Sequence, residues 1–318
     1  MKNRYQELYA TYSIVARDEE TGQLGVAVQT HQMCVGAHVP WLEPGVGAVA
    51  TQSLVNLGFG PMGLAMLREG VAAPKVVEAL VASDKNANVR QVAVVDGKGR
   101  VGAWTGPDCI PEAGHIIGEG YSVQANMMTN PTVVQAMSQA YEGTTGVLVE
   151  RMMAAMHAAQ DEGGDIRGMQ SAALVVVKEG FLGSGDPFEE RSLYDLRVDE
   201  HAKPLQELDR LVRLRHAQLI DSEGHAQLKE GQREEALESW RRARELAPEL
   251  EEMSYWQAVT LADEGADVQS AVKILAPMLS GDPRVEHWID LTRRIQACGI
   301  IERSGAGDEL LAALDSLA

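Results

Sequence analysis

The segment from residue 163 to residue 171 carries the densest group of side chains that could bind a small molecule. It reads Gly-Gly-Asp-Ile-Arg-Gly-Met-Gln-Ser and lies between an expected helix and an expected buried strand. Glycines let the backbone approach a ligand closely, and an arginine can hold a carboxylate through two hydrogen bonds. The alternative is that the glycine pair ends the helix and that Asp165 and Arg167 form a structural link. We favour substrate binding by Asp165, Arg167 and Ser171, with an anionic or amide-bearing small molecule as the ligand.

Three more polar residues stand where expected strands end. Asn126 follows the strand 121–125, and an asparagine amide is a good hydrogen-bond donor to the oxyanion of a tetrahedral intermediate. Asparagine also commonly stabilises turns, which is the alternative. Gln52 and Ser53 close the strand 46–53 and could line the rim of the same pocket, or they could be strand-end groups that are hydrogen-bonded locally. The sequence therefore offers Asn126 as a catalytic candidate, and Gln52 and Ser53 as substrate-binding candidates.

Metal and cofactor motifs are incomplete in this sequence. Cys109 and His115 are six positions apart, but no second pair completes a metal site, and Cys34 and Cys298 lie far along the chain from them. The run Gly-Glu-Gly at 118–120 lacks the third glycine of a dinucleotide fingerprint, and there is no Walker lysine. We therefore expect neither a metal ion nor a cofactor. The widely spaced cysteines favour a reducing, cytoplasmic location without disulfides.

The elements that must position the candidate residues are short strands joined by tight turns. Polar turns at 18–22 and 96–99 each end in glycine and indicate β-hairpins. Several strands are apolar at every position, which is typical of strands covered on both faces. The expected strands are 12–17, 24–30, 46–53, 90–95, 100–105, 121–125, 171–178 and 193–198, and the expected helices are 61–69, 74–82, 131–141 and 145–161. Antiparallel buried strands with paired helices predict an α+β domain built as a four-layer αββα sandwich.

From about Pro204 onward the pattern is helical throughout. Small and large residues then follow the spacing of a tetratricopeptide repeat, whose period is about 34 residues. These residues are Gly224, Ala236, Trp240, Ala243 and Pro248. A weaker copy of three of these positions follows 35 residues later. The alternative is ordinary packing of helical hairpins, but we expect a small all-α, tetratricopeptide-like domain that binds a protein partner or mediates self-association.

The formal net charge of −18 over 318 residues narrows the possible partners. Such a field repels phosphate backbones and anionic lipids, so we expect binding neither to nucleic acid nor to a membrane. No run approaches the roughly twenty uncharged apolar residues that a membrane helix needs. The first residues, MKNRYQE, lack the apolar core of a secretion signal.

Several motifs occur in the same order as in a known family. They are TYSIVARD at 11–18, GVAV at 25–28, PW at 40–41, GVGAVATQ at 45–52, the segment 58–63, AGH at 113–115, the segment 118–126, GGDIRGMQSAA at 163–173 and DLRVD at 195–199. Over roughly Thr11–His201 the chain resembles a bacterial family called domain of unknown function 1028, which is placed among the N-terminal nucleophile (Ntn) hydrolases. The resemblance implies an extension at 1–10 and an Ntn hydrolase-like domain at 11–203. The helical, tetratricopeptide-like domain expected at 204–318 lies outside the family. Analogy of fold also implies a homo-oligomer, whereas no substrate is implied.

This resemblance makes Thr11 the candidate nucleophile. Ntn hydrolases attack with a Ser, Thr or Cys that is the first residue of a chain, because its free α-amine, with a pKa of about 7.7–8.0, accepts the proton of the attacking hydroxyl. In this sequence ten residues precede Thr11. Either the chain is cut between Ala10 and Thr11, or Thr11 is only the opening residue of a strand, where threonine is common.

The surroundings of the nucleophile depart from those of proteasome-like relatives. Those proteins carry an Asp at the end of the second strand and a Lys further on, whereas this chain reads Gln-Thr-His-Gln at 29–32 and has no lysine between Lys2 and Lys75. Proteasome-like peptidase activity is therefore not expected. His31 could supply a polar or basic group to the substrate site, and the alternative is a structural or surface histidine.

Two functions are compatible with these observations. The first is an Ntn-type amidohydrolase that acts on a small amide-bond substrate, with Thr11 as nucleophile and Asn126 as oxyanion donor. The second is a non-catalytic Ntn-fold binding or assembly protein that recruits partners through its helical domain. The state of the bond between residues 10 and 11 separates the two.

Overall fold

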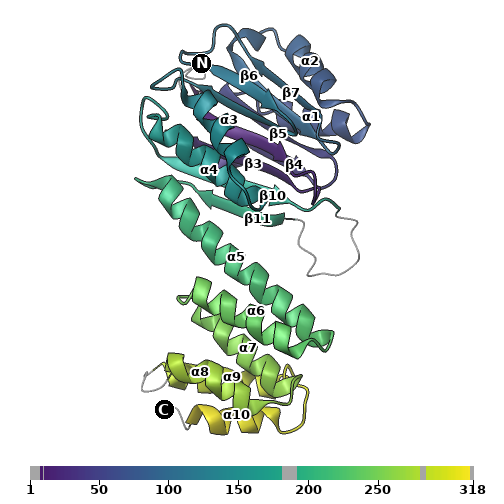
Figure 1. Ribbon diagram of the computed structural model, residues 1–318, viewed down its shortest axis with the longest axis vertical. Coiled ribbons are helices and arrows are strands. Elements are labelled where there is room, and N and C mark those ends of the chain that lie inside the picture. The colour runs from purple at the N-terminus through teal and green to yellow at the C-terminus, as the bar shows by residue number, and fades with distance from the viewer. Residues whose placement is uncertain (1–7, 10, 181–191, 280–283, 316–318) are drawn as a thin grey trace. The chain divides into compact units, whose positions relative to one another are not determined.

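The computed structural model describes residues 8–9, 11–180, 192–279 and 284–315 (Figure 1). Internal contacts divide the chain into two units, Met1–Val212 and Arg213–Ala318. The first unit contains two antiparallel sheets with helices, and the described part of the second is all helical. The α+β class predicted for the first part and the helical class predicted for the second are thus confirmed. The division falls inside a helix that begins at Pro204, close to the predicted boundary at 203/204.

A six-stranded antiparallel sheet has the order β11-β10-β3-β2-β9-β8. Its strands are β2 (Thr11–Arg17), β3 (Leu24–Thr30), β8 (Gly114–Gly118), β9 (Tyr121–Asn126), β10 (Ser171–Val177) and β11 (Ser192–Val198). The side chains of β2, β3, β9 and β10 are buried on both faces of the sheet, apart from the half-buried Arg17. The continuous apolar run of β10 predicted this for that strand. Strand β8 was not expected from the sequence, which has glycine at both of its ends.

The second sheet is five-stranded, with the order β1-β5-β6-β7 and with β4 paired to β5. Its strands are β1 (Leu8–Tyr9), β4 (Pro40–Glu43), β5 (Gly47–Leu54), β6 (Arg90–Asp96) and β7 (Val101–Thr105). Since β6 occupies one edge of β5, β1 and β4 share the other edge. Neither of these two short strands was expected from the sequence.

Helices cover the outer faces of both sheets (Figure 1). They are α1 (Phe59–Arg68), α2 (Ala73–Ser83), α3 (Val133–Gly143) and α4 (Leu148–Asp161), with short 3₁₀ turns at Val35–Ala37 and Ala87–Val89. One apolar cluster joins α1 and α2 to β5 and β6 of the five-stranded sheet. On the other sheet, a side chain at Gly25 would collide with Met152 of α4, so glycine permits this close approach of helix and strand.

The second unit consists of packed helices. The helices that form or enter it are α5 (Pro204–Lys229), α6 (Arg233–Leu246), α7 (Glu251–Asp263), α8 (Val268–Leu279), α9 (Val285–Ala297) and α10 (Ala306–Asp315). Trp240 is fully buried in its main core, and a Cβ at Gly224 would lie 2.6 Å from the Trp240 ring. This contact requires a small residue at position 224 beside the large one at position 240.

Candidate functional site

One row of polar residues crosses four strands of the six-stranded sheet. Thr11 pairs with Asn126 on one side and with Thr30 on the other, and Thr30 pairs in turn with Ser171. All four residues are buried. The fold therefore brings together Thr11, Asn126 and Ser171, which the sequence had singled out from segments far apart in the chain, and it adds Thr30.

Ser13, two positions after the start of β2, faces the five-stranded sheet. Its Oγ donates a hydrogen bond to Gln52 Oε1 at 2.7 Å and accepts one from Gln124 Nε2 at 2.6 Å. Gln52 Nε2 donates to Gln91 Oε1 at 2.7 Å, and Asn126 Nδ2 donates to the same oxygen at 3.0 Å. We call these five side chains the amide network. It joins the two sheets through uncharged groups that satisfy one another, which makes such a buried cluster stable.

The amide network also holds the main chain of Thr11. Gln52 Nε2 lies 3.3 Å from the Thr11 carbonyl oxygen, and Asn126 Nδ2 lies 3.5 Å from it. The amide of Asn126 is thus engaged by the protein itself, and its role as an oxyanion donor stays a prediction. Thr11 has no exposed surface. A substrate cannot reach its hydroxyl in this form of the chain.

A chain of hydrogen bonds connects the amide network to a cavity. Gln91 Nε2 donates to Thr105 Oγ1 at 2.9 Å, and Thr105 Oγ1 lies 2.8 Å from His115 Nδ1. Thr105 and His115 both line a cavity of about 480 Å³. Burial lowers the pKa of His115, so its imidazole is neutral at pH 7. The sequence analysis considers His115 only as a metal ligand. The structure instead places its imidazole beside Thr105, at the cavity end of the hydrogen-bond chain.

The chain changes sheets immediately before Thr11. Leu8 pairs with Leu54 and Tyr9 pairs with Ser53, so β1 belongs to the five-stranded sheet. Thr11 opens β2 in the six-stranded sheet. The change of sheet therefore lies between Tyr9 and Thr11.

Backbone strain is concentrated at the same ends of the strands. Cys34, Ser53 and Met127 have φ values of 60°, 69° and 59°, a region that residues with a Cβ rarely adopt. Ser53 lies near the end of β5, Met127 directly follows β9, and Cys34 lies in the loop after β3. Such strain persists only where the surrounding structure enforces it and is frequent at functional sites.

Within the segment 163–171, Asp165 is the central residue. Its side chain has no exposed surface and accepts hydrogen bonds from the backbone N–H of His31 at 3.0 Å and of Arg167 at 2.9 Å. The guanidinium of Arg167 also contacts this carboxylate, with Nη2 2.9 Å from Oδ2. The fold thus brings His31, Asp165 and Arg167 together. Their contacts are the structural link considered above, and their part in substrate binding stays a prediction.

The side chain of Ser171 also binds main chain. Its Oγ accepts a hydrogen bond from Val35 N at 3.1 Å and donates one to the carbonyl of Gln32. His31 Nδ1 lies 3.3 Å from the carbonyl oxygen of Met169. These bonds hold the loop after β3 against the segment that enters β10, next to the row that contains Thr11.

An ion pair fixes the end of β5 where β1 is paired. Arg90 Nε lies 2.9 Å from Asp84 Oδ2, and both side chains are largely buried. Arg90 Nη1 also donates to the carbonyl of Leu54, and Asn56 Nδ2 donates to Asp84 at 2.9 Å. Burial favours the neutral form of Asp84, but the hydrogen bonds from Asn86, Asn56 and Arg90 outweigh it and lower the pKa of this carboxyl.

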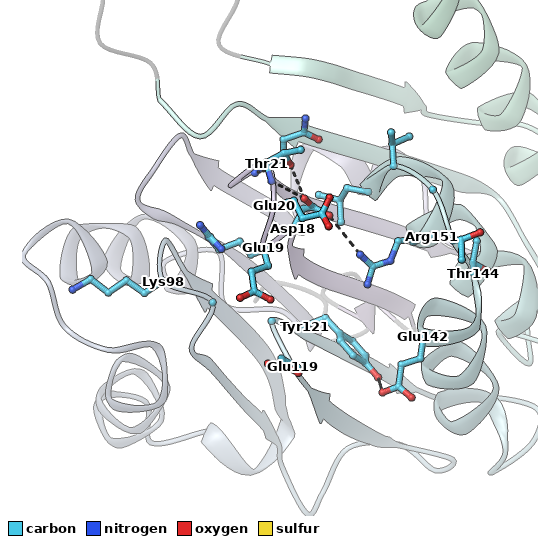
Figure 2. Close-up of a pocket in the computed structure, with 18 residues that line it drawn as sticks. Asp18, Glu19, Glu20, Thr21, Lys98, Glu119, Tyr121, Glu142, Thr144 and Arg151 are labelled. Atoms are coloured by element: carbon cyan, nitrogen blue, oxygen red, sulfur yellow. Dashed lines mark hydrogen bonds and ion pairs between the residues drawn. The ribbon is translucent and has the colours of Figure 1, made fainter.

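Figure 2 shows a larger pocket, of about 1010 Å³, at the other end of β2. It is lined by hairpin turns and by the loop before α4, and it contains none of the residues singled out from the sequence. Several of its charged groups are already paired: Asp18 accepts from Thr21 at 2.8 Å and lies 3.5 Å from Arg151. Burial and a hydrogen bond with Glu142 raise the pKa of Tyr121 to about 12, so its hydroxyl stays protonated.

The described part of the chain offers neither a cluster of metal ligands nor a membrane-spanning helix. No group of three or more His, Cys, Asp or Glu residues lies close enough together there to hold a metal ion. No described helix combines the length and the apolar character required to cross a membrane.

Comparisons with known proteins agree on one family. The description "Family of unknown function (DUF1028)" matches residues 11–208. The fold is similar to the crystal structure of protein SPO2555 from Silicibacter pomeroyi, which carries the same family description, with 29% sequence identity and a TM-score of 0.57. That match covers 64% of this chain and 84% of the other. None of the curated proteins compared with the chain matches it.

Proposed function

Because this chain belongs to the family of unknown function DUF1028, whose match begins at Thr11, we propose that it is an Ntn-type amidohydrolase acting on a small amide-bond substrate. One observation carries the proposal. Thr11 is the first residue of β2, inside the six-stranded sheet, whereas the residues before it belong to the other sheet. A cut between residues 10 and 11 would therefore free an N-terminal threonine without breaking a strand.

The proposed reaction begins after that cut. Thr11 Oγ attacks the amide carbonyl of the substrate, and its proton passes to the α-amine of Thr11 and then to the departing amine. Water hydrolyses the resulting ester, releases a carboxylic acid and restores the hydroxyl. The amide of Asn126 and backbone N–H groups would stabilise the oxyanion, and such a donor contributes about 10²–10³ in rate. This role requires Asn126 Nδ2 to exchange its contact with the Thr11 carbonyl for one with the substrate.

The proposal also includes the layering of the first unit and the type of repeat in the second. We infer that the two sheets and their outer helices form the αββα arrangement of Ntn hydrolases. An apolar cluster between the sheets and a second one under α1 and α2 support this inference. In the second unit, the contact between Gly224 and Trp240 supports a tetratricopeptide-like repeat, whose helices would bind a protein partner.

Full burial of Thr11 favours a second candidate function. Thr11 has no exposed surface, and it lies beside a network whose groups satisfy one another. A binding or assembly protein without catalytic activity would show the same arrangement. In that case residues 1–10 stay attached and the helical unit recruits partners. The proposal therefore needs a test that reads the covalent state of the chain.

Intact mass of the purified protein is that test. Loss of residues 1–10, together with hydrolysis of members of an amide library, supports the amidohydrolase. Thr11→Ala should abolish both hydrolysis and self-cleavage, and Thr11→Ser, which keeps a hydroxyl, should retain both at reduced rate. Turnover by the Thr11→Ala chain, or by a chain that still carries residues 1–10, would refute the mechanism.

A further inference from the structure

The edge of β5 that faces away from β6 is divided between two short strands. Strand β4 pairs with residues 47–50, and β1 pairs with Ser53 and Leu54. Beyond β4, Thr51 N donates to the carbonyl of Val39, and the pairing with β1 covers the described edge at Ser53 and Leu54. Loss of residues 1–10 would therefore leave the backbone groups of this edge open, and an open strand edge readily pairs with another extended chain.

We propose that this edge is a strand-addition site, which takes the acyl part of the substrate as a short, extended, peptide-like chain in the place of β1. As a statement about substrate, the inference rests on the proposed function. Main-chain hydrogen bonds to β5 would provide affinity, and the side chains of the added strand would provide selectivity.

The register of β1 sets the length of the bound chain. Leu8 lies opposite Leu54 and Tyr9 opposite Ser53, and one residue separates Tyr9 from Thr11. A ligand whose first two residues take the register of Leu8 and Tyr9 would bring its third residue next to Thr11. The site therefore suits an acyl group of about three residues, such as Leu-Tyr-Ala, with a small residue at the bond to be cut.

Two further features fit a site for an extended chain. The ion pair of Arg90 with Asp84, and the bond from Arg90 to the Leu54 carbonyl, hold this end of β5 through contacts in which β1 takes no part. Large apolar side chains are exposed on loops that follow or precede strands at this end: Met33 is 55%, Leu57 44% and Ile166 63% exposed. They could contact apolar side chains of a bound peptide.

The test measures binding and does not require turnover. The probe is acetyl-Leu-Tyr-Ala-amide with a fluorophore on its C-terminal side, and the readout is fluorescence anisotropy. Two proteins with Thr11→Ala are compared, the otherwise unchanged full chain and one with Leu8→Pro and Tyr9→Pro, because proline cannot donate to a strand ladder. We expect the proline variant to bind the probe at least ten-fold more tightly.

A peptide with methylated Leu and Tyr amide nitrogens is the matched control, since it keeps the side chains but loses the donors. It should bind at least ten-fold more weakly to the same protein. Equal binding of both peptides, or equal binding by both proteins, would overturn the strand-addition site. A chain that begins with an alanine at position 11 provides the second protein if the proline variant does not fold, and no binding there also overturns the inference.

Failure of the proposed function has a different signature. Binding of the probe without any hydrolysis by the chain with a free Thr11 would leave the strand-addition site standing and remove the amidohydrolase. Hydrolysis of amides that do not compete with the probe would leave the enzyme standing and remove the peptide-like substrate.

Discussion

The interface between the two sheets has an apolar part and a polar part, and one strand contributes to both. Val15 of β2 lies in an apolar cluster with residues of β3, β5, β6 and β10. Ser13, on the same face of the same strand, lies in the amide network with Gln52 and Gln124. The polar part includes the end of β2 that starts with Thr11. The strained residues Cys34, Ser53 and Met127 lie at or just beyond the strand ends on that side.

This difference shows that the polar part is not a requirement of the fold. An apolar interface would join two sheets equally well, because burial of apolar area is the main favourable term in folding. Buried amides need partners for every donor and acceptor, and an incomplete network costs free energy. The protein nevertheless retains this demanding arrangement beside Thr11, whereas the rest of the interface is apolar.

The largest effect is expected for Gln91→Leu. Gln91 accepts from Gln52 and Asn126, and it donates to Thr105 and to the carbonyl of Ala125. Each buried group left without a partner costs about 1–3 kcal/mol, so the free energy of unfolding should fall by more than about 3 kcal/mol. Denaturant titration checks this, and a loss below about 1 kcal/mol would mean that the network does not hold the sheets together.

Val28→Ala is the matched change in the apolar part. Val28 has no exposed surface and lies opposite Ser13 in the neighbouring strand. Loss of two carbons at about 0.8 kcal/mol each, with a small cavity term, predicts a loss of about 2 kcal/mol in the free energy of unfolding. Binding of the acyl-peptide probe should not change. A large effect of Val28→Ala on that binding would show that the two parts are not separate.

Gln29→Met should stabilise the protein. The Gln29 side chain is fully buried, and neither its nitrogen nor its oxygen has a hydrogen-bond partner among the described residues. An apolar side chain of similar size removes this cost and should raise the free energy of unfolding by about 1 kcal/mol. A thermal melt checks the sign. A clear destabilisation would show that Gln29 has a partner, such as a bound water, and belongs with the satisfied amides.

The smallest effect concerns the pH dependence of stability, to which His115 and His157 should contribute with opposite signs. Burial lowers the pKa of His115, so the unfolded chain binds more protons and stability falls as the pH drops below the unfolded value of about 6.5. A hydrogen bond with Asp209 raises the pKa of His157, so its contribution is complete below about 6.5 and is lost as the pH rises through the folded value. His157 and Asp209 are 41% and 44% exposed, so solvent screening keeps that second effect small. NMR titration of the two imidazoles should give a midpoint below 6.5 for His115 and above 6.5 for His157. The reverse order would contradict the burial of His115 and the hydrogen bond of His157.

Most elements could be expected from the sequence because their signals are local. Continuous apolar runs predicted β6 and β10, and glycine-ended turns predicted the hairpins on either side of residues 18–22 and 96–99. The three short strands β1, β4 and β8 carried no such signal. Strand β4 begins with proline and is only half-buried, so it shows neither alternation nor a continuous apolar run.

The site was only partly accessible from the sequence. Thr11, Asn126 and Ser171 were found because of the family motifs and because polar residues at strand ends stand out. Ser13, Gln91 and Gln124 were missed, since a polar residue inside a strand usually indicates an exposed face. The alternation of Ser122, Gln124 and Asn126 in β9 was the available signal, but it indicated a polar face without showing that a second sheet covers it.

The sequence by itself determined most of the strands and helices, and that Thr11 opens the region shared with the family, because hydrophobic periodicity, turn residues and motifs act over short stretches of chain. Only the tertiary structure decided that amides from β5, β6 and β9 meet around Thr11, and that the preceding residues pair with the opposite sheet. Those contacts join positions tens of residues apart, and their energy exists only once both sheets have formed and excluded water from between them.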